Sequence, residues 1–116
     1  MTATSQNFTL YQGDDLVLQV TVKNPDGTVK DLTGASSIKW AMAKAAKGTA
    51  LLSKTLGAGI TNAAPLTGVF EVTIAQGDTP TIAAGAYYHE AELVDAAGKK
   101  STVLVGTATI VQALIA

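Results

Sequence analysis

The sequence contains no cysteine and no arginine. Without cysteine, the chain can form neither a disulfide framework nor a zinc site with thiolate ligands. All eight of its cationic side chains are lysines, whereas proteins that read phosphates and base edges depend heavily on the forked guanidinium of arginine. The net charge of −1 offers no basic surface either. We therefore expect no nucleic-acid partner.

Long apolar runs and a secretory signal are also missing. No run approaches the roughly 20 apolar residues that a membrane helix needs, and the C-terminal IVQALIA is too short to cross a bilayer. Residues 1–15 have neither the basic nor the apolar region of a signal peptide. We expect a soluble protein made in a bacterial cytoplasm, with no signal peptide and no membrane partner.

Apolar residues are plentiful: 47% of the 116 residues are hydrophobic and only 15% are charged. This composition can supply a core and argues against disorder. The length suits one domain, because single cores commonly contain about 100–200 residues. Many glycine, threonine and valine residues favour strands and tight turns. We expect residues 1–116 to fold as one domain built from strands.

Alternation of apolar and polar residues predicts the main strands. Residues 15–23, 69–74 and 86–95 alternate with a period of two, as in a strand with one buried face. The inward positions of these strands and of residues 38–42 should form the core. The predicted core residues are Leu18, Val20, Ile38, Trp40, Phe70, Val72, Tyr87 and Leu93.

Residues 36–56 permit two interpretations. The alanines and lysines of AMAKAAKGTALL favour a helix. Ile38 and Trp40, two residues apart, and the interrupting Gly48 favour a strand followed by a loop. We expect the strand, with a second short strand near residues 50–55.

The connections carry turn signals. Residues 24–27, Asn-Pro-Asp-Gly, predict a β-turn, and residues 96–99 predict the turn of a hairpin. Residues 56–68 are rich in glycine, asparagine and proline and predict a loop. Residues 75–85 predict a connection with one helical turn around residues 78–82. Short strands without long helices indicate an all-β domain, an antiparallel β-sandwich of about seven strands.

Three stretches resemble a family of small phage domains: FTLYQGDDLVLQVTVKNPDGTVKDLTGASSIKWAMAK, GVFEVTI and GAYYHEAELVDAAGKKSTVLVGTATIV. The matching features are Gly13-Asp14 before the first long strand, the element Asp31 to Ala35, Gly85 two residues before Tyr87, and the late Gly106. They resemble the immunoglobulin-like β-sandwich domains at the N-terminus of baseplate upper proteins and in related tail or fibre proteins.

The resemblance implies a single immunoglobulin-like β-sandwich and a structural role in a virion. It also implies other virion or tail subunits as partners, and a homo-oligomer. In the family this module usually precedes fibre or receptor-binding parts, and little follows it here. The implied role is therefore that of a structural protein, an adaptor or a capsid decoration subunit, located in the virion.

His89 is the only histidine and is flanked by Tyr88 and Glu90. In a strand, adjacent side chains point to opposite faces, so His89 and Glu90 cannot form a base and its orienting partner. We expect His89 to be a hydrogen-bonded residue at the margin of the core. No G-x-S-x-G, Walker or H-E-x-x-H motif is present. We expect no catalytic residues and no enzyme activity.

Asp14 and Asp15, with Asp78 or Asp95, could offer oxygen ligands to Ca²⁺. No D-x-D-x-D-G spacing accompanies them, and adjacent aspartates before a strand commonly form a turn. We expect no metal and no cofactor. Trp40 permits two interpretations, as a core residue or as a platform on which a sugar stacks.

The C-terminal segment Ala113-Leu114-Ile115-Ala116 is too apolar for a solvated tail and would gain by docking. The sequence predicts a non-enzymatic structural or interaction module of a bacteriophage or phage-like particle, in a tail, baseplate, fibre attachment or capsid decoration. The alternative is a carbohydrate- or ligand-binding module. The candidate interaction residues are Leu114, Ile115, Tyr88 and Tyr11.

Overall fold

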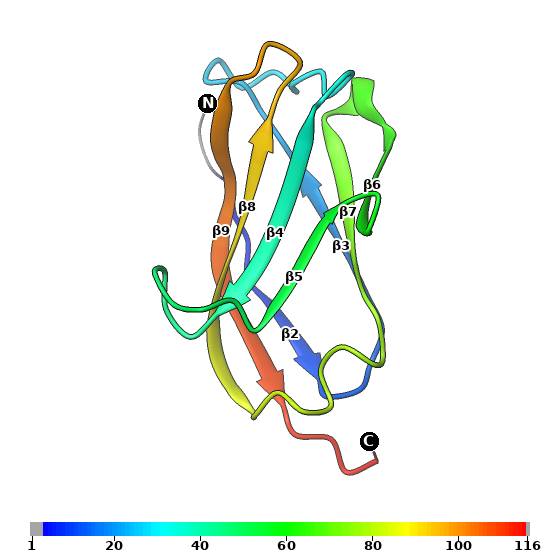
Figure 1. Cartoon of the computed structure of the whole chain (residues 1–116), viewed down its shortest axis with the longest axis vertical. Coiled ribbons are helices and arrows are strands. Elements are labelled where there is room, and N and C mark those ends of the chain that lie inside the picture. Colours follow the sequence, from blue (N-terminus) through cyan, green and yellow to red (C-terminus); the bar gives the residue numbers. More distant parts are fainter. Residues whose placement is uncertain (1–3, 116) are drawn as a thin grey trace.

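The computed structural model describes residues 4–115 and shows an all-β chain (Figure 1). The one helical element in this range is the short 3-10 helix η1 (Pro65–Thr67). The strands are β1 (Thr4–Ser5), β2 (Phe8–Tyr11), β3 (Leu16–Thr21), β4 (Ser37–Ala43), β5 (Leu52–Leu56), β6 (Gly59–Ala64), β7 (Val69–Ile74), β8 (Gly85–Val94) and β9 (Lys100–Val111).

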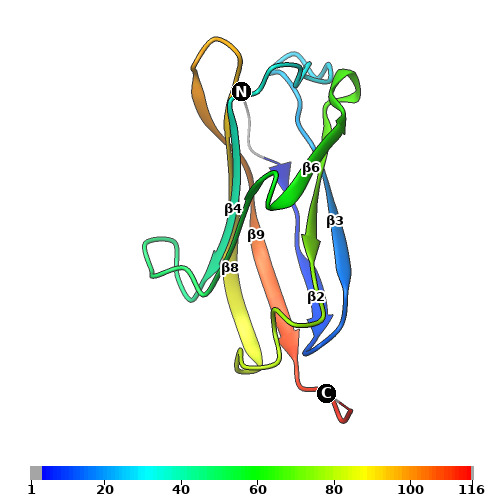
Figure 2. The same cartoon turned by 45° about the vertical axis from the view of Figure 1, so that its right-hand side comes forward.

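All nine strands belong to one mixed sheet that curls nearly into a barrel (Figure 2). The molecule measures 44 × 25 × 22 Å along its principal axes. Its order is β1-β9-β8-β4-β5-β6-β7-β3, with β2 also paired to β9. Most neighbours are antiparallel, but β1 and β2 run parallel to β9, and β5 runs parallel to β6. The all-β prediction is confirmed, and the prediction of purely antiparallel pairing is wrong for these strands.

The barrel does not close by strand pairing between β3 and the N-terminal strands. β3 pairs with β7 along its whole length, and β2 pairs with β9. Across this seam, the side-chain amide of Gln6 donates to the backbone carbonyl of Gln19 at 3.1 Å. A side chain therefore spans the gap where a barrel would have a ladder of backbone hydrogen bonds.

The core lies inside the curled sheet, and the period-two pattern of the sequence fills it. Val20, Ile38, Phe70, Val72 and Leu93 are completely buried. All eight predicted core residues are buried, so this prediction is confirmed. The core also contains further residues beyond these eight: Leu10, Val22, Leu32, Met42, Ala43, Ile60, Ile74, Ile82, Ala91, Val103, Leu104, Ala108 and Ile110.

The strand interpretation of residues 37–43 is confirmed, since β4 pairs with both β5 and β8. The predicted turn at residues 24–27 is also confirmed, because the Gly27 N–H donates to the Asn24 carbonyl at 2.9 Å and Gly27 has a φ of 91°. The predicted hairpin is formed by β8 and β9. Within it, a register shift beside Ala91 leaves Val103 without an opposite residue, as in a β-bulge.

Two predicted connections are wrong in detail. The loop prediction for residues 56–68 fails because Gly57 and Gly59 adopt positive φ and turn the chain into β6, where Ile60 is buried beside Val72. Residues 78–82 form hydrogen-bonded turns rather than a helical turn. There the buried Thr79 side chain accepts a hydrogen bond from the Gly13 N–H at 2.9 Å, which fixes this loop against the β2–β3 connection.

Candidate functional site

His89 lies on the inner face of β8 and is completely buried. The Trp40 indole N–H from β4 donates to His89 Nδ1 at 3.0 Å. His89 Nε2 lies 2.7 Å from the backbone carbonyl of Gln6, between β1 and β2. Because Nδ1 accepts, Nε2 carries the proton and donates to Gln6. The imidazole is therefore neutral and links three separate elements.

Gly106 makes this link possible. It lies opposite His89 in the β8–β9 pair, on the inner face of β9. A Cβ at this position would lie 1.9 Å from the Gln6 carbonyl oxygen and 2.8 Å from His89 Nε2. The Gln6 carbonyl thus occupies the space that a side chain would take. The break between β1 and β2 occurs here because Gln6 bends inward to reach His89.

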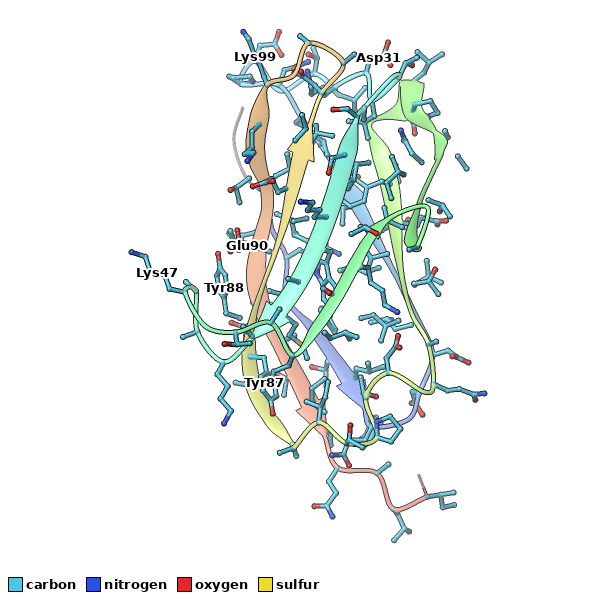
Figure 3. All side chains as sticks on the ribbon, in the orientation of Figure 1. Asp31, Lys47, Tyr87, Tyr88, Glu90 and Lys99 are labelled. Atoms are coloured by element: carbon cyan, nitrogen blue, oxygen red, sulfur yellow. The ribbon has the colours of Figure 1, made fainter. Side chains whose placement is uncertain are left out.

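The ring of His89 is enclosed by apolar and aromatic neighbours. The Phe8 ring meets it edge-on, with centroids 5.0 Å apart, and the Trp40 ring centroid lies 6.1 Å away. Glu90 points to the opposite face of β8, on the outside of the sheet (Figure 3). The prediction that His89 and Glu90 do not pair agrees with this geometry. The prediction that His89 lies at the core margin is wrong, because the inward bend of Gln6 covers it.

Burial lowers the pKa of His89 below its ordinary value of 6.5, although its hydrogen bond to Gln6 raises it in part. In the unfolded chain the imidazole titrates near its ordinary value. The neutral form therefore stabilises the native state fully above pH 6.5, and this contribution is lost as the pH falls toward the lower native pKa.

We expect the denaturation midpoint to fall as the pH is lowered from 8 to about 5, a range above the ordinary titration of aspartates. Urea titrations at several pH values measure this dependence. Because the chain has no other histidine, the variant His89→Gln should show a flatter profile over the same range. An equally steep profile in His89→Gln would assign the effect to another group.

Three of the four aspartates considered as calcium ligands, Asp15, Asp78 and Asp95, have other partners. Asp15 accepts the Gln76 N–H at 2.6 Å. Asp78 accepts the Ala75 N–H and forms an ion pair with Lys54 at 2.7 Å. Burial alone would raise the pKa of Asp78, but the hydrogen bonds and charge of Lys54 and the Ala75 N–H lower it. The lysine thus supplies the cation at this carboxylate.

Asp95 lies in the β8–β9 turn, where its carboxylate accepts the N–H groups of Ala97 and Lys99 and faces Lys30 at 3.6 Å. It is separated along β8 from the loop that contains Asp78. Within residues 4–115, no group of three or more His, Asp or Glu side chains could hold a metal ion. Asp15 and Asp78 bind the adjacent N–H groups of Gln76 and Ala75, but Asp95 lies apart from them, and the candidate aspartates do not form such a group.

The aromatic candidates are not gathered on one surface. Trp40 is only 1% exposed, so the interpretation of this residue as a core tryptophan is confirmed. Its indole is not at the surface, where a sugar could stack on it. Tyr11 is 54% exposed at the end of β2. Tyr88 lies half-buried on the outer face of β8, where burial, together with the charge of Glu90, raises its pKa (Figure 3).

The C-terminal segment leaves the body of the molecule after β9 (Figures 1 and 2). Leu114 is fully exposed and Ile115 is 89% exposed. Ala116 lies outside the described residues. Tyr11 pairs with Val111 at the end of β9, so its ring lies at the same end of the molecule as this segment.

One further exposed apolar residue lies at this end, although it was not among the candidate interaction residues. Val17, near the start of β3, is 53% exposed. The Gln12 N–H donates to the Val111 carbonyl at 2.9 Å. Only a short connection separates Gln12 from β3, so Val17 lies at the same end of the molecule as the end of β9. We call Tyr11, Val17, Leu114 and Ile115 the apolar end of the molecule. The outward position of Val17 in the alternation of residues 15–23 was the signal for its exposure.

Comparison of the sequence with models of known protein families finds no match, and comparison with curated proteins finds none either. Within residues 4–115, no helix is long and apolar enough to span a membrane. The apolar end and the buried link around His89 must therefore be interpreted from their own geometry.

Proposed function

We propose that this chain is a non-enzymatic structural module that binds other protein subunits of a bacteriophage or phage-like particle. The observation that carries this proposal is the apolar end, above all the exposure of Leu114 and Ile115. Exposed apolar side chains that lie together mark surfaces that other proteins cover. The resemblance to phage tail and baseplate domains is the reason for proposing a phage or phage-like particle.

An immunoglobulin-like β-sandwich is the fold that we propose within the all-β class. One layer would consist of β4, β8 and β9 with the N-terminal strands, and the other of β3, β7 and β6. The pairing order supports this division, with β5 passing from one layer to the other. Counting β1 with β2 and β5 with β6 gives about seven strands, as in constant-type immunoglobulin domains.

The environment of His89 supports a non-enzymatic role. A general base must reach the proton that it abstracts and needs a group that orients it. Here both ring nitrogens are engaged, one by Trp40 and the other by Gln6, and the ring is completely buried. The histidine organises the fold rather than meeting a substrate.

The energetics of the apolar end suit assembly. Burying Leu114 and Ile115 would contribute roughly 1.5–3 kcal/mol each, if they find an apolar surface. Association itself costs an estimated 4–15 kcal/mol in lost translational and rotational freedom. The two side chains can therefore bias assembly, but further contacts must add to them. Backbone hydrogen bonds at a sheet edge are one source.

We expect the double variant Leu114→Ser/Ile115→Ser to lose most of its binding to particles, by about tenfold or more in affinity. Particles lacking the chain would be mixed with purified wild-type or variant protein, separated on a density gradient and assayed for bound protein. Leu66→Ser is the matched control, because Leu66 is 73% exposed in η1, away from the apolar end.

Thermal melts would show that the double variant folds normally, since neither side chain contacts the core. Equal binding by the wild type and the folded double variant would contradict the assignment of the apolar end as the contact surface. Loss of binding by Leu66→Ser to the same extent would also contradict it.

A further inference from the structure

β3 has an open edge. It pairs with β7 through all six of its residues, and no other strand among residues 4–115 pairs with it. The Gln19 carbonyl accepts from Gln6 across the seam, so its backbone groups face away from β7. In an antiparallel pair, every second residue turns its backbone N–H and C=O to the same side, so those of Val17 face the same way as those of Gln19. The first half of β3, around Val17, therefore presents hydrogen-bonding groups toward the seam.

This edge lacks the features that normally prevent strand addition. Natural edge strands carry charged residues, proline, or bulges, or are very short. β3 reads LVLQVT, with no charge and no proline, and its register with β7 is regular. The Gln6 side-chain amide binds the Gln19 carbonyl. Nearer the start of the strand, the Val17 side chain is 53% exposed.

The chain also contains a segment whose chemistry fits this edge. Residues 112–115, Gln-Ala-Leu-Ile, carry no charge and follow β9 out of the body at the end where β3 begins (Figure 2). In its own molecule, the segment runs away from the body, and Leu114 and Ile115 stay exposed rather than pairing with β3. A second copy can present the same uncharged segment to this edge from outside.

We propose that residues 112–115 of one copy add as a strand to the open edge of β3 in a second copy, beside Val17. This inference rests on the proposed function, since it specifies how the apolar end binds protein. Two copies meeting at their apolar ends can exchange the segments reciprocally about a twofold axis, which closes the assembly. Tyr11 of each copy then lies within the contact.

The absence of cysteine from the chain permits a direct test. Equal amounts of the single variants Val17→Cys and Leu114→Cys would be mixed and treated with a short bis-maleimide cross-linker. Addition of the segment beside Val17 predicts a heterodimer that forms at least about tenfold faster than random collision allows. The matched control is a mixture of Leu66→Cys with Leu114→Cys, in which the partner cysteine lies outside the contact.

Sedimentation equilibrium of the wild-type chain completes the test. We expect a reversible dimer that is weakened about tenfold or more by Leu114→Ser/Ile115→Ser. Equal cross-linking rates in the two mixtures, or a wild-type chain that stays monomeric, would overturn strand exchange. If particles still bound the wild type but not the double variant, the apolar end would serve a different subunit and the proposed function would stand. If particles bound neither the wild type nor the double variant, the proposed function would be wrong, whatever the result of cross-linking.

Discussion

Replacing Trp40 by alanine should lower the free energy of unfolding by about 3–5 kcal/mol, as for other large buried aromatic side chains. Trp40 is 1% exposed at the centre of β4. Its removal leaves a cavity in the core and also removes the donor to His89 Nδ1. Urea denaturation followed by far-UV circular dichroism measures the loss.

Two further variants separate packing from hydrogen bonding at this position. Trp40→Phe keeps most of the apolar volume but leaves His89 Nδ1 without its donor, and we expect it to cost about 1–3 kcal/mol for the unsatisfied buried group plus a smaller packing term. Lys39→Ala, on the outer face of the same strand, should change stability by less than about 0.5 kcal/mol. A Trp40→Ala protein as stable as Lys39→Ala would place the indole in solvent.

Replacing Gly106 by alanine should release the N-terminal strands from β9 and cost about 2–6 kcal/mol. The estimate combines overpacking, at about 1–3 kcal/mol, with a lost buried hydrogen bond, at about 1–3 kcal/mol. The new methyl group would lie 1.9 Å from the Gln6 carbonyl oxygen, so Gln6 must move and abandon His89. Hydrogen exchange should become faster in residues 4–11 than in β3.

Gly77→Ala is the matched control for this substitution. A Cβ on Gly77 meets nothing within 4 Å, and its backbone does not adopt a positive φ. The control should therefore change neither stability nor exchange of residues 4–11. Unchanged exchange in Gly106→Ala would show that the Gln6 backbone does not lie over Gly106 and would remove the link between His89 and the N-terminal strands.

Local alternation predicted the strands because each has one face in the core. Phe70, Val72 and Ile74 are buried at every second position, as the pattern requires. The same rule failed at residues 59–64, where only Ile60 is buried and glycine and asparagine suggested a loop. β6 forms because β7 offers a partner edge, which is tertiary information absent from the local sequence.

The His89 link could not be predicted, because it joins residues far apart in the chain. Gln6 and His89 are 83 positions apart, and the contact depends on a missing side chain at Gly106. The sequence did predict that His89 and Glu90 lie on opposite faces. For the apolar end, the sequence singled out Leu114, Ile115 and Tyr11. The alternation also placed Val17 on the outer face, but only the structure brings it to the same end as the C-terminal segment.

The proposed function makes this chain a structural component of a phage or phage-like particle. The most direct measurement is quantitative mass spectrometry of intact particles purified by density gradient from the cells that produce the chain. We predict that the protein is present in a fixed number of copies per particle, as a symmetric assembly requires, and that it remains bound through repeated gradients. Its absence from the particles, with the protein recovered only in the unassembled fraction, would contradict the claim.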